Sequence, residues 1–339
     1  MHKIVTFGEI MLRLSTQRFL RFSQAQSFNI NYGGGEYNVA VSLSNFGLNT
    51  EFITRLPNNE IGRSALMEIN KRNVGSSFIT FGGDRLGIYF FETGAGTRGS
   101  NVVYDRSNSA MATLRPGGFN WKDILKGATW FHWSGITPAV SQHAAEECLE
   151  AVKTANELGI LISSDLNYRS KLWKYGKTPA QVMPGLLQYS NIILGDIDTA
   201  LFMLGKSKVA PNYSNLKSLP ALYDQIFEHC PNLQTIATTL RYSVSASHQR
   251  IGGMLYNGQE LFNANIKEVT PVVDRVGSGD AFMAGLIYGL INSTNYQYAL
   301  DFAVASCCLK HTIYGDCNLV TKEEIEKYLS GENDGSVQR

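Results

Sequence analysis

The feature that most limits the fold of this chain is a regular alternation of short strands with helices. Apolar, β-branched runs alternate with segments whose apolar residues recur at helical spacing. The predicted strands are 3–8, 51–55, 128–133, 160–165, 191–194 and 234–239. The predicted helices are 34–46, 60–72, 141–158, one beginning at Thr178-Pro179, 196–204, 280–291, 298–311 and one opened by the capping box Thr321–Glu324. This order predicts an α/β fold whose mostly parallel sheet is covered by helices on both faces, with ligands at the carboxyl ends of the strands.

Two stretches interrupt the alternation. Residues 87–92 and 101–105 are aromatic and β-branched runs joined by a loop rich in Gly and Thr, which predicts an inserted β-hairpin. The loop matches G-x-G-x-x-G, but a dinucleotide site needs a helix after that motif, whereas a strand-like run follows here. More hairpin-like sequence extends to about Phe262.

Composition excludes several classes of function. The chain has 30 basic and 29 acidic residues, a net charge of +1, which argues against a broad nucleic-acid surface or a polybasic membrane patch. Its longest apolar run, 281–291, is far shorter than the about 20 residues of a membrane span. The five cysteines contain no C-x-x-C pair, and the first residues lack the apolar region of a signal peptide. We therefore expect a cytoplasmic protein.

The strongest local signal is the segment 274–285, in which small residues come directly before an apolar helix. Gly277 and Gly279 allow a close approach of the backbone to a ligand. The first N–H groups of a helix have no partner within it and carry the positive end of its dipole, so Gly277, Ser278 and Gly279 are predicted to form an anion hole. Asp280 stands at its edge. The alternative is that Asp280 is only an N-cap and the glycines only a turn.

Segment 274–285 resembles the C-terminal signature of the ribokinase-like, or phosphofructokinase-B, carbohydrate kinases. Segment 33–40, with Gly47 beyond it, resembles their N-terminal signature, and the resemblance covers essentially the whole chain. It implies a ribokinase-like three-layer α/β fold, with 1–339 as a single domain. A small β-sheet lid built from about 11–33 and 86–112 would be inserted in the α/β core.

The same resemblance implies phosphoryl transfer from ATP to a sugar hydroxyl, with Mg²⁺ as the accompanying ion. Such transfer needs positioning and charge neutralisation more than covalent help. The anion hole would hold the migrating phosphoryl group. Asp280 would accept the proton of the attacking hydroxyl, and we expect it to be ionised at neutral pH because the helix terminus favours its anion.

Further segments resemble one branch of this family, the 2-keto-3-deoxygluconate kinases. They are 8–14, 104–110, 131–139, 165–173 and 310–318. Neutral-sugar members usually carry an aspartate near the end of the first strand, where this chain has Leu12-Arg13, with no carboxylate to repel an anion. The branch phosphorylates the terminal hydroxyl of a sugar acid, and arginine can bind a carboxylate in bidentate fashion.

The resemblance implies a sugar-acid pocket made of Gly34, Tyr89, Tyr104, Arg106, Arg169 and Asp316. Four of these assignments have an alternative. The two tyrosines could be ordinary cross-strand partners, Arg169 a surface arginine, and Asp316 a turn residue.

The nucleotide side departs from the family pattern. Where many relatives have N-x-x-E, this chain has Gly195-Asp196-Ile197-Asp198, so Asp196 and Asp198 are the candidates for binding Mg²⁺ through water. The usual glycine-rich nucleotide loop is replaced by segment 239–243, which makes Thr239, Arg241 and Ser243 the candidate nucleotide contacts.

Three expectations remain open. The lid hairpin often pairs between subunits in this family, which implies a homodimer or a higher homo-oligomer. A fructokinase- or ribokinase-type activity is the first alternative function. A catalytically weak sugar-acid-binding protein is the second, because of the altered nucleotide and metal segments.

Overall fold

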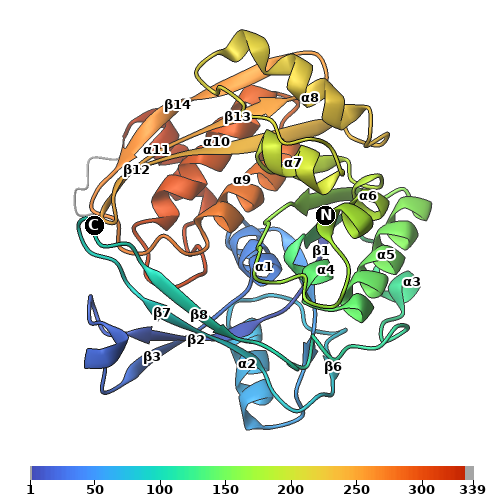
Figure 1. Ribbon diagram of the computed structural model, residues 1–339, viewed down its shortest axis with the longest axis vertical. Helices are drawn as coiled ribbons and strands as arrows, with labels where there is room; N and C mark the ends of the chain where they lie inside the picture. Colours follow the sequence, from blue (N-terminus) through green and yellow to red (C-terminus); the bar gives the residue numbers. More distant parts are fainter. Residues whose placement is uncertain (1, 333–339) are drawn as a thin grey trace.

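The computed structural model describes residues 2–332, which form two main β-sheets and a set of covering helices (Figure 1). The strands are β1 (Lys3–Phe7), β2 (Met11–Thr16), β3 (Phe28–Gly33), β4 (Asn49–Ile53), β5 (Arg55–Leu56), β6 (Thr80–Phe81), β7 (Gly87–Glu92), β8 (Asn101–Asp105), β9 (Trp130–Ser134), β10 (Leu161–Asp165), β11 (Ile192–Leu194), β12 (Thr235–Ser245), β13 (His248–Tyr256) and β14 (Leu261–Val269). The helices are α1 (Gly35–Asn45), α2 (Glu60–Lys71), α3 (Trp121–Ile124), α4 (Ile136–Val140), α5 (Gln142–Glu157), α6 (Pro179–Leu187), α7 (Ile197–Met203), α8 (Pro220–Phe227), α9 (Ser278–Asn292), α10 (Tyr296–Lys310) and α11 (Lys322–Ser330), with 3-10 turns η1 (Phe22–Gln24) and η2 (Leu216–Ser218).

The large sheet has the strand order β14-β13-β12-β11-β10-β9-β1-β4. The strands from β4 to β12 run parallel, and the β12, β13 and β14 edge is antiparallel. The predicted mostly parallel sheet is therefore confirmed. The hairpin-like sequence after Thr239 does not form a separate unit, because β12 continues to Ser245 and pairs with β13.

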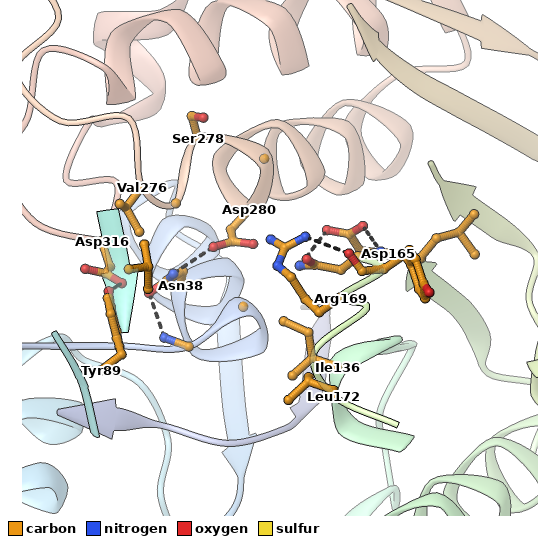
Figure 2. A pocket seen from close by; sticks show the side chains of 18 of the residues that line it. Asn38, Tyr89, Ile136, Asp165, Arg169, Leu172, Val276, Ser278, Asp280 and Asp316 are labelled. Carbon is orange, nitrogen blue, oxygen red and sulfur yellow. Dashed lines mark hydrogen bonds between the residues drawn. The ribbon is translucent and has the colours of Figure 1, made fainter. Parts of the chain in front are cut away.

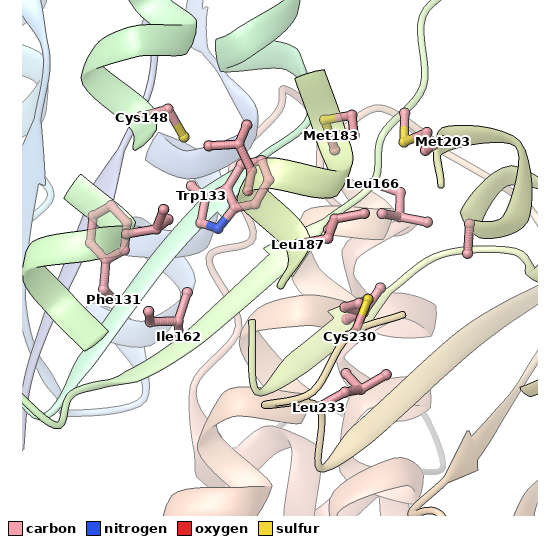
Figure 3. Close-up of a cluster of buried hydrophobic side chains, with 14 of the residues drawn as sticks. Phe131, Trp133, Cys148, Ile162, Leu166, Met183, Leu187, Met203, Cys230 and Leu233 are labelled. Atoms are coloured by element: carbon pink, nitrogen blue, oxygen red, sulfur yellow. The ribbon is translucent and has the colours of Figure 1, made fainter. Parts of the chain in front are cut away.

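Alternate residues of the central strands pack into opposite helical layers, which explains their near-continuous apolar sequence. Trp130 of β9 lies in the core beneath α1, α9 and α10, whereas the adjacent Phe131 and Trp133 lie in the core beneath α5 to α8. Figure 3 shows Trp133 near Cys148 of α5 in that second core. The sheet is thus covered on both faces, as the alternation predicts.

Helix starts follow their capping signals. Thr321 accepts a hydrogen bond from the N–H of Glu324, and the Glu324 carboxylate accepts one from the N–H of Thr321 (2.8 Å), which confirms the predicted capping box. Ser141 likewise caps α5 through the N–H of Ala144. No helix within residues 2–332 has the length and apolar character needed to span a bilayer.

The small sheet has the order β3-β2-β7-β8, from the two stretches predicted to form a lid. The glycine-rich loop joins β7 to β8 and leads into a strand, as expected from its context. In Figure 1 the small sheet stands apart from the large one at the lower left. Its movement as a lid and the single-domain organisation of 1–339 stay predictions, and residues 1 and 333–339 lie outside the described part.

Candidate active site

One cavity of about 1050 Å³ lies between the small sheet and the carboxyl ends of β10, β11 and β12. Its small-sheet end is lined by Met11, Tyr89, Phe91, Val102, Tyr104 and Arg106, and its large-sheet end by Leu194, Gly195, Asp196, Thr199, Thr239 and Arg241. The predicted Gly34, Arg169, Gly277, Ser278, Gly279, Asp280 and Asp316 also line it. The fold thus gathers residues from nearly the whole length of the chain, as the sequence predicts.

The start of α9 is built around Gly277. This residue caps the helix with a left-handed backbone (φ 78°), and a Cβ here would overlap the carbonyl oxygen of Asp316. The helix begins at Ser278, so Asp280 is its third residue rather than its N-cap. The Asp280 side chain instead accepts a hydrogen bond from Asn38 of α1 (2.7 Å, Figure 2). The alternative that Asp280 is only an N-cap is wrong.

The charge of Asp280 is set mainly by burial. The pKa of Asp280 is raised to about 6, mainly by burial. The charges of Glu36 and Asp316 contribute to the rise, whereas the bond from Asn38 and the charge of Arg169 oppose it. The helix terminus therefore does not dominate, contrary to the expected reason for ionisation. Asp280 is still mostly ionised at pH 7.

Space for a reacting group exists beside Gly35, the first residue of α1. A Cβ built on Gly35 would lie 3.6 Å from Oδ1 of Asp280, 3.8 Å from Nδ2 of Asn167 and 3.9 Å from Oγ of Ser134. Three polar side chains thus converge on a position that glycine leaves open. Gly34, the N-cap of α1, lies beside it on the cavity wall.

Asp165 is a site residue that sequence reasoning missed. It is the last residue of β10 and accepts a hydrogen bond from the N–H of Asn167 (3.0 Å). The pKa of Asp165 is raised to about 7, first by burial and then by the charge of Asp280, while the charge of Arg169 opposes the rise. Its signal in the sequence is a polar residue at the carboxyl end of a buried strand.

Arg169 extends into the cavity from the loop after β10. Its guanidinium points toward Asp280 in Figure 2, and its charge lowers the pKa of both Asp165 and Asp280. It donates a hydrogen bond to the carbonyl oxygen of Tyr168 (3.0 Å) and forms no ion pair with any residue of 2–332. Arg169 is solvent-exposed, as the alternative of a surface arginine predicts, but it also lies in the cavity wall.

Tyr89 and Tyr104 are direct cross-strand partners of β7 and β8, with ring centroids 5.9 Å apart. The alternative of ordinary cross-strand partners is therefore confirmed. Both tyrosines also line the cavity, so the two roles are compatible. Tyr104 is exposed, whereas the buried Tyr89 donates its hydroxyl hydrogen bond to Asp316.

Arg13 and Asp316 do not face the cavity as free charges. Arg13 is fully buried in β2, where it pairs with Asp274 (2.7 Å) and Asp316 (2.8 Å). The alternative of Asp316 as a mere turn residue is wrong, because its carboxylate carries this ion pair and the bond from Tyr89. Arg13 consequently cannot attract an anionic ligand as an open positive charge.

The sequence interpretation that no carboxylate stands near the first strand needs correction. Glu9 follows β1, is buried, and accepts hydrogen bonds from Arg106 and Ser109. Arg106 is therefore largely neutralised by Glu9. Its Nε, however, is buried without a hydrogen-bond partner among the described residues, and Arg106 does line the cavity.

The large-sheet end presents two arginines in a different state. Arg241 donates a hydrogen bond to Oγ of Ser278 (2.8 Å), and Arg275 lies just before the anion hole. Burial, and then the nearby charge of Arg241, lower the pKa of Arg275. Neither arginine forms an ion pair within the described part of the chain. Sequence reasoning selected Arg241 but not Arg275.

Two of the predicted residues lie elsewhere. Ser243 donates a hydrogen bond to the side chain of Gln249 on β13 (2.8 Å) and is not in the cavity wall, because β12 continues beyond the end of its other neighbour, β11. Asp196 lines the cavity, but Asp198, within the first turn of α7, does not. Burial and then Asp198 raise the pKa of Asp196. Residues 2–332 contain no cluster of three side chains suited to holding a metal.

Comparisons with known proteins agree with this geometry. Residues 1–322 match the model of the pfkB family carbohydrate kinases. The chain is 32% identical over 341 residues to the 2-dehydro-3-deoxygalactonokinase of Haloferax volcanii, covering 99% of each chain. It shares 40% identity and a TM-score of 0.92 with the structure of 2-dehydro-3-deoxygluconokinase from Thermotoga maritima, covering 97% of this chain and 98% of that one. The structure of a fructokinase with bound ATP from Xylella fastidiosa, at 20% identity and a TM-score of 0.74, covers 98% of this chain and 99% of that one and shows the same fold. The ribokinase-like fold is thereby confirmed, and the chain belongs to the pfkB family of carbohydrate kinases.

Proposed function

We propose that this sugar kinase transfers the γ-phosphoryl group of ATP to the terminal hydroxyl of 2-keto-3-deoxygluconate. The observation that carries the proposal is the placement of Asp280 at the first turn of α9, facing a cavity that also holds the unpaired Arg169. A carboxylate base beside a helix N-terminus suits phosphoryl transfer, and the arginine suits a substrate with a carboxylate.

In the proposed reaction, Asp280 accepts the proton of the sugar hydroxyl, whose oxygen forms a bond to the γ-phosphorus as the bond to the ADP oxygen breaks. Asn38 fixes one oxygen of Asp280, which leaves Oδ1 toward the open position beside Gly35. The N–H groups of Gly277 and Gly279 would stabilise the charge on the migrating group, whereas the N–H of Ser278 donates to the carbonyl oxygen of Arg275 (3.4 Å).

The phosphates of ATP fit the large-sheet end. Arg241 and Arg275 form no ion pair with the residues of 2–332, so a polyanion would supply their counter-charge. Mg²⁺ commonly binds one or two carboxylates and substrate phosphates while it keeps several waters. Here Asp196 would hold the ion through water, and the ion would neutralise phosphate charge. The carboxylate of Asp196 at the large-sheet end of the wall fits that mode.

The experiment that tests the proposal is an ADP-release assay with ATP and Mg²⁺. Its substrates are 2-keto-3-deoxygluconate, its galactonate epimer, fructose and ribose, with Asp280→Asn as the blank. We expect turnover with one or both sugar acids and far less with the neutral sugars. Turnover mainly on fructose or ribose would favour a fructokinase- or ribokinase-type activity instead. Tight sugar-acid binding without turnover would favour a weak binding protein.

We also propose that the protein is a homo-oligomer. The small sheet exposes Phe28, Ile30 and Val103, with Ile30 64% exposed on the edge strand β3. An edge strand with exposed apolar residues is a ready pairing surface. Sedimentation velocity should show at least a dimer, and Ile30→Lys should shift it toward monomer; a wild-type monomer would contradict this.

A cytoplasmic setting stays a prediction, with the five cysteines buried and free.

A further inference from the structure

Lys310, the last residue of α10, is fully buried, although the proposed chemistry does not use it. Its ammonium donates hydrogen bonds to the backbone carbonyl oxygens of Asp274 (3.2 Å) and Ile313 (3.1 Å). An ammonium group is costly to bury unless it is paired and hydrogen-bonded. A buried lysine that bonds two separate segments of backbone therefore needs a reason.

The two segments that Lys310 joins are the loop before α9 and the loop after α10. The N–H groups of Val273 and Asp274 donate to the carbonyl oxygen of His311 (2.8 and 3.2 Å), and the N–H of Gly315 donates to Oδ2 of Asp274 (3.2 Å). Gly277, the cap of α9, packs directly on the carbonyl of Asp316. The position of the anion hole thus depends on how these two loops are held together.

The charges around Lys310 balance. Asp274 and Asp316 are two buried anions, and Arg13 pairs with both of them. Arg13 alone would leave one negative charge uncompensated beneath a site that must receive phosphate. Burial lowers the pKa of Lys310, and the charges of Asp274 and Asp316 oppose that shift. The two hydrogen bonds that Nζ donates to carbonyl oxygens fit an ammonium, which would supply the second cation.

We propose that Lys310 is a positioning residue whose ammonium acts as a built-in cation, fixing the two loops so that the Gly277 to Gly279 amides are preformed for phosphate. Carbonyl oxygens of this kind also bind small monovalent cations, so the protein carries in its own chain the charge that a bound ion could otherwise supply. The catalytic consequence rests on the proposed function; the effect on the loops does not.

The first test compares Lys310→Met, which keeps the length without the charge, and Lys310→Ala, which leaves a space, with the control Lys267→Met on exposed β14. A displaced anion hole should lower kcat about 10²-fold in both Lys310 variants while the sugar-acid KM stays within about twofold. Ammonium or potassium chloride should partly restore Lys310→Ala but not Lys310→Met, whereas tetramethylammonium, too large for the space, should restore neither. Wild-type kcat in Lys310→Met would overturn the proposal.

The second test needs no variant. Wild-type turnover should be equal in sodium, potassium and tetramethylammonium chloride at the same ionic strength. A requirement for potassium would show that an external ion completes the loops, and it would overturn the proposal even if the Lys310 variants do not fold.

The third measurement separates this proposal from the proposed function. Hydrogen exchange should become at least about tenfold faster at the amides of Val273, Val276 and Gly315 in Lys310→Met, while the core of β9 keeps its wild-type rate. If the wild type phosphorylates no sugar acid, the function fails but this measurement still tests the role of Lys310. Unchanged exchange at these amides would reject that role.

Discussion

The two ends of the cavity differ in how their positive charges are balanced. At the small-sheet end, Arg13 pairs with two aspartates and Arg106 with Glu9. At the large-sheet end, Arg241 and Arg275 form no ion pair within residues 2–332, although the charge of Arg241 lowers the pKa of Asp196. The first arrangement fixes the shape of the site, whereas the second leaves positive charge for a ligand to neutralise.

Burial explains the difference. Arg13 is fully buried, and an arginine in that position must be paired because a lone buried charge costs several kcal/mol. Arg241 is exposed and Arg275 half-buried, so water stabilises them until a ligand replaces it. The unpaired cations therefore mark where an anion is expected to bind, and the paired ones mark where the protein has fixed its own geometry.

The largest effect is expected at Asp280, which lies between the two ends. Asp280→Asn keeps the size of the side chain and its contact with Asn38 but removes the base, so kcat should fall by at least the 10²- to 10⁴-fold typical of losing a general base. Steady-state kinetics with Asp301→Asn as the control would measure it. Near-wild-type turnover in Asp280→Asn would remove Asp280 from its catalytic role.

The difference in charge balance between the two ends of the cavity is tested most directly at the large-sheet end. The double variant Arg241→Gln/Arg275→Gln should lower kcat/KM for ATP about 10²-fold, since each charged hydrogen bond contributes about 1.5–3 kcal/mol and neighbouring effects do not fully add. The KM for the sugar acid should change little. If instead the sugar-acid KM rises as much as the ATP KM, the two ends do not recognise different ligands.

A smaller and more selective loss is expected for Arg169→Ala. Removal of this unpaired cation should reduce kcat/KM for the sugar acid about tenfold or more, because a charge-assisted bond to the carboxylate is lost. Any residual use of a neutral sugar should fall much less. An equal loss on both substrates would mean that Arg169 acts through Asp165 and Asp280 rather than on a carboxylate.

Local signals in the sequence predicted most helices and strands, and pairings across the chain account for what was missed. The hairpin strands Gly87–Glu92 and Asn101–Asp105 have the predicted bounds, and Asp280 was found because its motif is contiguous. The ion pairs joining Arg13 to Asp316 and Arg106 to Glu9 link residues 303 and 97 positions apart, so no local pattern reveals them. Ser243 was misplaced because the sequence does not show how far β12 continues.

The pH dependence should follow the protonation of Asp280. Its pKa of about 6 means that the base is lost as the pH falls through 6, so kcat/KM should be about tenfold lower at pH 5 than at pH 7 and should level off above pH 7. Initial rates in constant-ionic-strength buffers would measure this. An acid limb centred near pH 4 would show that Asp280 is more hydrated than its burial indicates.

The smallest effect concerns Asp165, an acid near Arg169 that forms no ion pair within the described residues. Its pKa of about 7 in the folded protein exceeds the unfolded value of about 3.9, so its ionisation costs stability as the pH rises from 4 to 7. Asp165→Asn can still accept the hydrogen bond from Asn167. It should therefore raise the free energy of unfolding by about 1–3 kcal/mol at pH 8, with a gain that shrinks toward zero near pH 4.

Urea unfolding at both pH values, with Asp301→Asn as the control, would measure it. A gain that does not depend on pH would mean that Asn packs better than Asp here, and a loss at pH 8 would mean that Arg169 balances the charge of Asp165 in solution.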